Sequence, residues 1–288
     1  VFIPWKPSLV FDKERFKYHF KFGYKLTLSS LIDTVYNDAY RIVIGKFYSP
    51  AQVGYFHQAE TLRLFPVNQL SAVLGKVTYP YFSNIDNDVA LKSAYRKTMK
   101  LVMFVTLPVM LSLILVAEEG FRFVFGEKWL PAVPYFQLLA VASIIRPVSS
   151  YNLNILKVKG RSDLFLLVEI IKKIIGVLFL VVGLAFDVIG LVVSLVAFSF
   201  ASYLINSIYS GKLISYRLLE QVKDLAVVVA IGISTFASLS LAKSYLDQFL
   251  RSDIISILIF GTLLPILYAG LCVLLDRELK NIVWSLRK

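Results

Sequence analysis

Long apolar runs separated by short polar breaks are the dominant pattern along this chain. A bilayer core is about 30 Å thick, and a helix that rises 1.5 Å per residue needs about 20 apolar residues to cross it. Runs of this length occur eight times, so the pattern predicts eight membrane-spanning helices. Their expected bounds are residues 20–44, 55–81, 100–117, 132–156, 164–186, 188–209, 225–246 and 254–275.

The composition agrees with this pattern and narrows the class of protein. Hydrophobic residues make up 57% of the chain, charged residues only 17%, and the mean hydropathy is +0.69. A soluble globular domain has a more polar balance, so we expect an all-α integral membrane protein. Cys272 is the only cysteine, and no Cys and His spacing resembles a zinc site. We therefore expect no disulfide within the chain, no metal and no cofactor.

Arginine and lysine gather at alternate breaks and at both ends of the chain, and the net charge is +12. If the first 19 residues are cytoplasmic, the opposite side of the membrane holds only Lys46, Arg122, Lys128, Lys243 and Arg251. Cytoplasmic loops of membrane proteins are enriched in Lys and Arg. We therefore expect both termini of this chain to be cytoplasmic, and we expect the charge to orient the protein in the membrane rather than to bind nucleic acid.

Some charged residues lie inside the apolar runs, where each costs about 2.5–3.5 kcal/mol on insertion scales. Lys172 and Lys173 follow Glu169 in the run 164–186, and Glu169 can neutralise only one of them. One of these two positive charges should therefore remain without an acidic partner. A phosphate or diphosphate group in a hydrated cavity would compensate it, so these residues are candidates for a cationic cavity lining.

In the first run, Asp33, Asn37 and Arg41 recur every four residues and share one helical face, with Tyr40 beside them and Asp38 on the next stripe. This face fits two interpretations equally. In the first interpretation, the face lines a polar passage. In the second, Asp38 and Arg41 form a local ion pair near the outer end of the helix, from which Arg41 reaches water.

Two further arginines lie deep in apolar runs. Arg63 follows Glu60 by three residues, which predicts an internal ion pair. Arg146 precedes Pro147, and Asn154 lies further along the same run, so a helix kink and a polar lining coincide. Polar residues also join helices to one another, but that role needs no full charge at mid-depth, which favours a functional role for Arg146.

Four stretches carry a resemblance to a known family. They are IGKFYSPAQVGYFHQAETL at 44–62, VTYPYFSNI at 77–85, YRKTMKLVMFVTLPVM at 95–110 and FGEKWLPAVPYFQLLA at 125–140. Together they resemble the C-terminal part of the bacterial polysaccharide flippases of the Wzx and WzxC type, within the multidrug, oligosaccharidyl-lipid and polysaccharide exporter superfamily. These stretches mark architecture and do not identify the substrate.

The resemblance implies a transporter of about fourteen helices, with two MATE-like six-helix lobes around a central cavity and an appended helix pair. Residues 1–19 would be a cytoplasmic amphipathic segment between the lobes, 20–217 the second lobe, and 218–288 the appended pair with a basic tail. The first lobe is absent from this chain, so we expect a fragment of the complete transporter.

The activity that the resemblance implies is translocation of undecaprenyl-diphosphate-linked oligosaccharide repeat units across the bacterial inner membrane. No enzyme motif occurs in the sequence, and the expected partners are membrane lipid, this substrate, a polysaccharide polymerase and a coupling H⁺ or Na⁺. The candidates for a cationic lining are Arg41, Arg63, Arg146, Lys172 and Lys173. The candidates for polar lining or ion coupling are Asp33, Asn37, Asp38, Tyr40, Asn154 and Glu169.

Two alternatives remain open at this point. An ion-coupled multidrug exporter of the same superfamily would prefer an acidic cavity for cationic drugs, which the basic residues disfavour. A membrane scaffold that does not transport would use the internal charges only for pairing between helices.

Overall fold

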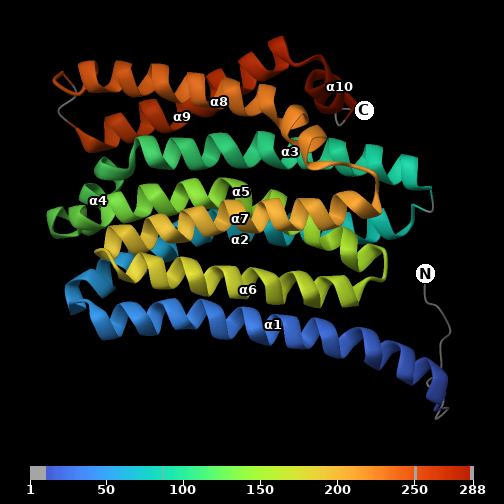
Figure 1. The fold of residues 1–288 in the computed structure, drawn as a ribbon. Coiled ribbons are helices and arrows are strands. Elements are labelled where there is room, and N and C mark those ends of the chain that lie inside the picture. The colour runs from blue at the N-terminus through green and yellow to red at the C-terminus, as the bar shows by residue number, and fades with distance from the viewer. Residues whose placement is uncertain (1–10, 86, 250–251, 286–288) are drawn as a thin grey trace.

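The computed structural model describes residues 11–85, 87–249 and 252–285, and these residues fold into helices joined by short turns (Figure 1). The helices are α1 (Lys13–Phe47), α2 (Pro50–Ser83), α3 (Asp88–Leu115), α4 (Ala117–Phe125), a 3₁₀ turn η1 (Glu127–Ala132), α5 (Val133–Val158), α6 (Ser162–Leu184), α7 (Val188–Leu213), α8 (Leu218–Leu246), α9 (Asp253–Leu275) and α10 (Arg277–Ser285). No strand is assigned among the described residues, so the predicted all-α class is confirmed.

Short polar signals in the sequence set the helix starts. Ser49 and Gln52 form a capping box at the start of α2, and Pro50 occupies the first helical position, where its missing N–H costs nothing. The Asp187 side chain caps α7 by accepting a hydrogen bond from the Gly190 N–H at 2.9 Å. These caps fall in the breaks between apolar runs, which is why each run becomes one uninterrupted helix.

Five helical segments are long and apolar enough to cross a membrane, namely α3, η1 with α5, α7, α8 and α9. The predicted runs 20–44 and 55–81 lie within α1 and α2, and the run 164–186 extends two residues past the end of α6. These three helices have comparable lengths but contain more charged and polar residues. Large apolar side chains such as Ile174, Leu258 and Leu274 are exposed on the outside of the bundle. Such a surface fits lipid and not water, and the protein is a multi-pass membrane protein.

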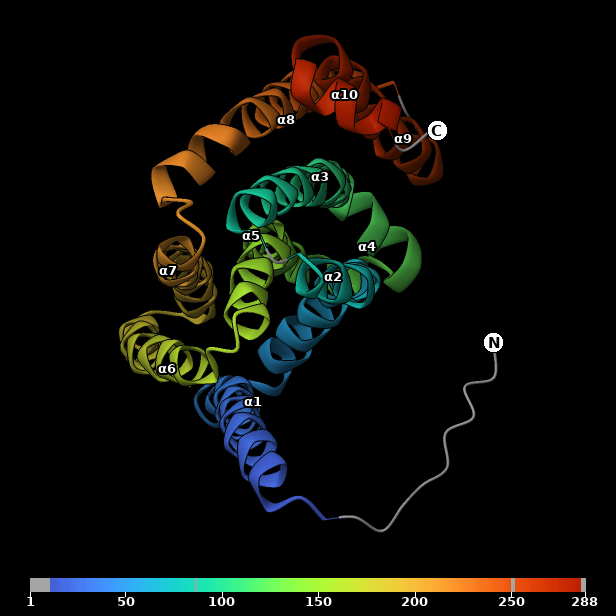
Figure 2. The same cartoon turned by 90° about the vertical axis from the view of Figure 1, so that its right-hand side faces the viewer.

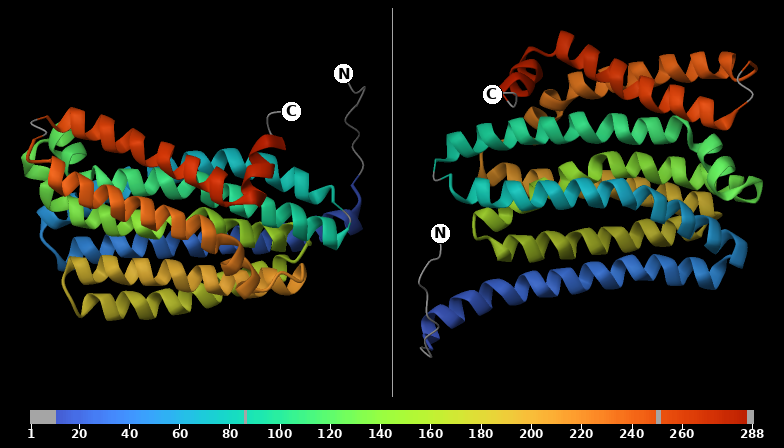
Figure 3. Two further views of the ribbon diagram at one scale, coloured as in Figure 1. Left: turned by 90° about the horizontal axis from the view of Figure 1, so that it is seen from above. Right: turned by 180° about the vertical axis from the view of Figure 1, so that it is seen from behind.

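Consecutive long helices run in opposite directions, and α5 is at the centre, in contact with α2, α3 and α7 (Figures 1 and 2). The end of the bundle at which α1 begins also holds the α2–α3, α5–α6 and α7–α8 turns and α10, and we call it the basic end. Helix α1 packs mainly against α6, whereas α8 and α9 form an outer layer on α3 (Figure 3).

Ion pairs attach this outer layer at both ends of the bundle. At the basic end, three cationic side chains four residues apart on α3 reach acidic partners beyond it. The pairs are Lys92 with Glu220 (2.6 Å), Arg96 with Asp224 (2.7 Å) and Lys100 with Asp276 (2.7 Å). At the opposite end, Lys243 of α8 pairs with Glu119 of α4, and Arg122 pairs with Asp253 at 3.0 Å. Basic residues on α3 that were read only as topology signals therefore also hold helices together.

The expected division between a lobe and an appended pair at residues 217 and 218 coincides with the start of α8. Of the expected amphipathic segment 1–19, residues 1–10 lie outside the described residues, and residues 13–19 form the first turns of α1. The assignment of these segments to lobes of a larger transporter stays a prediction.

Candidate functional site

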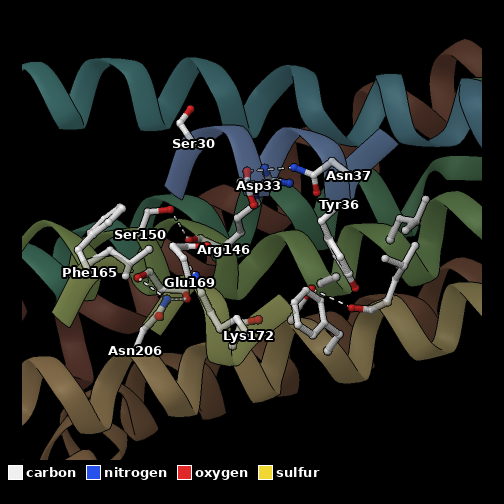
Figure 4. A pocket seen from close by; sticks show the side chains of 18 of the residues that line it. Ser30, Asp33, Tyr36, Asn37, Arg146, Ser150, Phe165, Glu169, Lys172 and Asn206 are labelled. Carbon is white, nitrogen blue, oxygen red and sulfur yellow. Dashed lines mark hydrogen bonds and ion pairs between the residues drawn. The ribbon is translucent and has the colours of Figure 1, made fainter. Parts of the chain in front are cut away.

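A cavity of about 390 Å³ lies among α1, α5, α6 and α7, with one side chain of α2 reaching into it. Figure 4 shows Asp33 and Asn37 of α1 on one side of this space, and Arg146, Glu169 and Lys172 of α5 and α6 on the other. The charged residues around it are four cationic and two acidic side chains: Arg63, Arg146, Lys157, Lys172, Asp33 and Glu169. The cavity therefore has a surplus of positive charge within an apolar bundle.

The structure brings together six of the eleven side chains that the sequence singled out. Those that line the cavity are Asp33, Asn37, Arg63, Arg146, Glu169 and Lys172. Those that do not line it are Asp38, Tyr40, Arg41, Asn154 and Lys173. The cavity lies toward the basic end of the bundle, because its polar lining residues on α6 and α5 come from the first half of α6 and the second half of α5.

Two cations of the cavity form no ion pair with a described residue: Lys157, which lies over the Phe165 ring, and Arg146. The Arg146 side chain is exposed, lines the cavity, and makes no ion pair or hydrogen bond with the residues that the structure describes. The following Pro147 cannot donate a helical hydrogen bond, and the Ser150 hydroxyl satisfies the Arg146 carbonyl at 3.0 Å. The five N–H donors of this guanidinium are thus open to a ligand.

Arg63 lies deeper and is only loosely held. It is 7% exposed, its Nη1 donates to the Ser143 hydroxyl at 3.4 Å, and its nearest carboxylate is Glu60 at 3.7 Å. The predicted internal pair with Glu60 therefore forms, but it is long. The Arg63 Nε has no hydrogen-bond partner among the described residues. A buried guanidinium with an unused donor is poorly satisfied by the protein alone, so an anionic ligand would stabilise it.

The two lysines of α6 are each paired, which corrects the expectation that one of them stays uncompensated. Lys172 donates to Glu169 at 2.5 Å, and Lys173 pairs across the helix interface with Asp33 of α1. Lys173 also lies 4.5 Å from the centre of the Tyr36 ring. The second carboxylate comes from a distant part of the sequence, so the local spacing could not reveal it.

Helix α1 can approach α6 closely because Gly176 has no side chain. A Cβ atom at this position would collide with the ring of Tyr36. Tyr36 packs edge-on against Tyr40 with ring centroids 5.5 Å apart, and Tyr40 is buried in this aromatic contact. Tyr40 thus belongs to the α1–α6 packing rather than to the cavity wall.

The remaining polar side chains of α1 pair outside the cavity. Arg41 is half-exposed and forms ion pairs with Asp38 at 3.2 Å and with Glu60 of α2 at 3.3 Å. Of the two interpretations of this face, the local pair describes Asp38 and Arg41, whereas Asp33 and Asn37 line the cavity. Asn154 is half-buried on α5 outside the lining.

Sequence reasoning did not assign one cation and most of the neutral polar side chains to the cavity. Lys157 lines the cavity and lies 4.8 Å from the centre of the Phe165 ring, although its position near a break marked it only as a topology signal. Ser199, Ser202 and Asn206 of α7 also line the cavity. Their spacing of three and four residues is the signal that places them on one helical face.

The chain is similar in sequence to several proteins of polysaccharide biosynthesis. A family model described as "Polysaccharide biosynthesis protein" matches residues 1–134. The teichuronic acid biosynthesis protein TuaB of Bacillus subtilis (strain 168) is 30% identical over 161 residues, which cover 56% of this chain and 33% of that protein. The lipopolysaccharide biosynthesis protein WzxC of Escherichia coli (strain K12) is 27% identical over 161 residues, with the same shares of both chains.

A membrane protein of unassigned character from the cps region of Klebsiella pneumoniae is 26% identical over 172 residues, which cover 59% of this chain and 35% of that protein. The chain thus spans about a third of the length of these relatives. No solved structure matches it.

Proposed function

Because the chain is a member of the Wzx-type polysaccharide flippase family over the part matched to its relatives, we propose that the complete protein translocates an undecaprenyl-diphosphate-linked oligosaccharide across the bacterial inner membrane. In this proposal the chain supplies the second lobe of the transporter and the appended helix pair. The first lobe would form the facing wall of the passage. Both termini of the chain would be cytoplasmic, so the basic end of the bundle would face the cytoplasm.

The cationic cavity is the observation that carries this proposal. A sugar head group linked through a diphosphate cannot cross hydrocarbon unaided, because its charges and hydroxyls would lose their partners in water. Arg146 offers a guanidinium that no described residue pairs with or hydrogen-bonds to, and Arg63 offers one donor unused within the described part of the same cavity. A guanidinium can bind two phosphate oxygens at once, and at the buried Arg63 this attraction is stronger than at a surface.

Neutral polar side chains of the cavity would bind the hydroxyl groups of the sugar. Ser150, Ser199, Ser202 and Asn37 line the same space and can both donate and accept hydrogen bonds. The polyprenyl tail would stay in lipid beside the bundle, and rocking of the two lobes would expose the head group first to one side of the membrane and then to the other. A polymerase would then consume the unit at the outer face.

Ion coupling would use the acidic residues of the cavity, Asp33 and Glu169. Asp33 holds α1 to α6 through Lys173, so a proton that neutralised Asp33 would weaken the contact between these helices. Such a device would link protonation to the position of α1. Asp38 lies outside the cavity and is not part of this proposal.

A multidrug exporter of the same superfamily is the alternative activity, and the charge of the cavity speaks against it. Cationic drugs would meet four cationic side chains and only two acidic ones, both of which are already paired with lysines.

Complementation of a flippase-deficient bacterium tests the proposal. We expect the complete gene to restore surface polysaccharide, measured by gel and by antibody binding at matched membrane abundance. Arg41→Gln, which removes a guanidinium that lies outside the cavity, should restore it equally well. A wild-type protein that reaches the membrane in normal amounts, restores no polysaccharide with any repeat unit tried, and instead confers drug resistance would overturn the proposal in favour of the exporter.

A further inference from the structure

Two stripes of side chains run next to each other along the first turns of α1. One is aromatic: Phe16, Phe20 and Tyr24 stack in series with ring centroids 5.7 and 5.9 Å apart, and Phe11 lies 5.3 Å from Phe16. The other consists of lysines at four-residue spacing, namely Lys13, Lys17, Lys21 and Lys25. Residues four apart lie above one another on a helix, so each set forms a continuous line along one face.

Neither stripe has a partner within the described residues. The exposed fractions of the four aromatic side chains lie between 44% for Tyr24 and 73% for Phe11. No ion pair to any of the four lysines is found in the described part of the chain, whereas the neighbouring Arg15 pairs with Asp12 at 3.2 Å. Like charges four residues apart on a helix repel each other. An external anion that lies along the stripe would relieve this repulsion.

Helix α1 is also too long to be used entirely in crossing a membrane. Its 35 residues extend about 52 Å at 1.5 Å per residue, against a hydrocarbon core of about 30 Å. The part from Leu26 onward, which includes the cavity residue Asp33, packs on α6, and the two stripes lie before it. They therefore leave the bundle at its basic end, where α1 curves away from α6 (Figures 1 and 3).

The curvature has a cause in the sequence. Thr27, Ser29 and Thr34 each donate a hydroxyl hydrogen bond to the carbonyl four residues earlier, at 3.1, 2.7 and 3.0 Å. Such bonds compete with the helical N–H donors and bend helices. Gly23 adds a position without a side chain at the junction between the stripes and the packed part. The bend can therefore bring the first turns of α1 toward the plane of the membrane.

We propose that the first turns of α1, residues 11–25, form a docking surface for the anionic lipid headgroups of the leaflet at the basic end of the bundle. The aromatic stripe enters the headgroup boundary and the lysine stripe lies among the lipid phosphates, which is the arrangement of interfacial amphipathic helices. An upright helix would place only one or two of these turns in the headgroup layer, whereas a helix bent into the surface places all of them there. Because α1 also carries the cavity residues Asp33 and Asn37, docking of its first turns on lipid would influence the position of one wall of the cavity. The proposal does not depend on what the cavity transports.

The charge of the four lysines sets the expected strength of lipid docking. A lysine near an anionic membrane surface contributes roughly fivefold to binding, and the attraction is screened over a Debye length of about 8 Å at physiological salt. Replacing all four lysines by glutamine should therefore lower the ratio of docked to free helix by a factor of roughly 600. High salt should lower it as well.

The test uses the complete protein in nanodiscs of phosphatidylcholine, with and without phosphatidylglycerol. A nitroxide label at Phe20→Cys, in a Cys272→Ala background, reports its depth through its accessibility to oxygen and to a water-soluble nickel chelate. We expect the label to be lipid-immersed only in the anionic nanodiscs, and we expect the fourfold variant Lys13→Gln/Lys17→Gln/Lys21→Gln/Lys25→Gln to lose this difference. The control Lys97→Gln/Lys223→Gln removes two charges from the same end of the bundle and should keep it.

Two outcomes would overturn the proposal. A label that is in water in both membranes means that α1 projects from the surface. A label that is immobilised in both membranes, with or without the lysines, means that another protein segment covers the aromatic stripe.

Discussion

Arg146→Glu should abolish the restoration of surface polysaccharide in a flippase-deficient bacterium while leaving the protein folded and inserted. The reversal places a carboxylate where the proposed diphosphate binds, so attraction becomes repulsion. Arg146→Gln should lower transport about tenfold or more, because a hydrogen bond between charged groups contributes roughly 1.5–3 kcal/mol. Arg146→Lys should retain part of the activity, since an ammonium keeps the charge but loses the two-point geometry of a guanidinium.

Folding and transport can be separated at this residue because Arg146 has no ion pair or hydrogen bond through its side chain in the described part of the chain. Its replacement therefore removes no internal contact of that kind, and thermal unfolding in detergent should be unchanged. The matched control is Arg41→Gln, which loses two ion pairs outside the cavity and should transport normally. If Arg146→Gln unfolds early and transports normally once stabilised, the residue is structural and its assignment to the substrate is wrong.

Lys100→Met should be the most destabilising single change at the basic end of the bundle. Lys100 is 5% exposed and Asp276 is 6% exposed, and they form an ion pair at 2.7 Å, with Glu278 at 3.0 Å from the same ammonium. Removing one partner of a buried pair leaves a charge without compensation and costs about 3–5 kcal/mol. We expect a clear fall in the thermal unfolding temperature of the complete protein in detergent, with early loss of the contact between α3 and the α9–α10 turn.

A second change distinguishes this account from a general effect of lost charge. Lys100→Met/Asp276→Leu removes both charges, and replacing a buried ion pair by apolar residues is often neutral or stabilising, so much of the loss should be recovered. Lys97→Met removes an exposed lysine from the same helix and should change stability little. A double variant that is less stable than either single variant would contradict the interpretation.

The class and most of the helices could be predicted from the sequence because they depend on local properties. Length and apolar content identify a spanning segment, and the caps around Pro50 and Asp187 fall in the breaks between runs. The apolar runs that contain charged residues were harder to interpret, because hydropathy alone cannot tell a buried charge from an exposed one. Asp38 and Arg41, three residues apart, formed the local pair that spacing allows.

The contents of the cavity could be predicted only in part, for a physical reason. Helical spacing gives the face on which a side chain lies but not the helix opposite that face. One of Lys172 and Lys173 was expected to keep an uncompensated charge, yet α1 brings Asp33 to Lys173. Lys157 was not among the predicted site residues, although it lines the cavity. Arg146 was singled out because it combines a charge, a proline and polar neighbours at mid-depth, and these are all local to one helix.

The central claim is that the cationic cavity recognises the diphosphate of a lipid-linked sugar, and reconstitution tests it most directly. The complete protein is placed in liposomes with a fluorescent polyprenyl-diphosphate oligosaccharide, and a quencher that cannot cross the membrane reports the amount moved between leaflets. We predict that the wild-type protein moves this lipid and that Arg63→Gln/Arg146→Gln, reconstituted in equal amount, does not. Equal rates for the two proteins, or equal transport of an uncharged lipid-linked sugar by the wild type, would contradict the account.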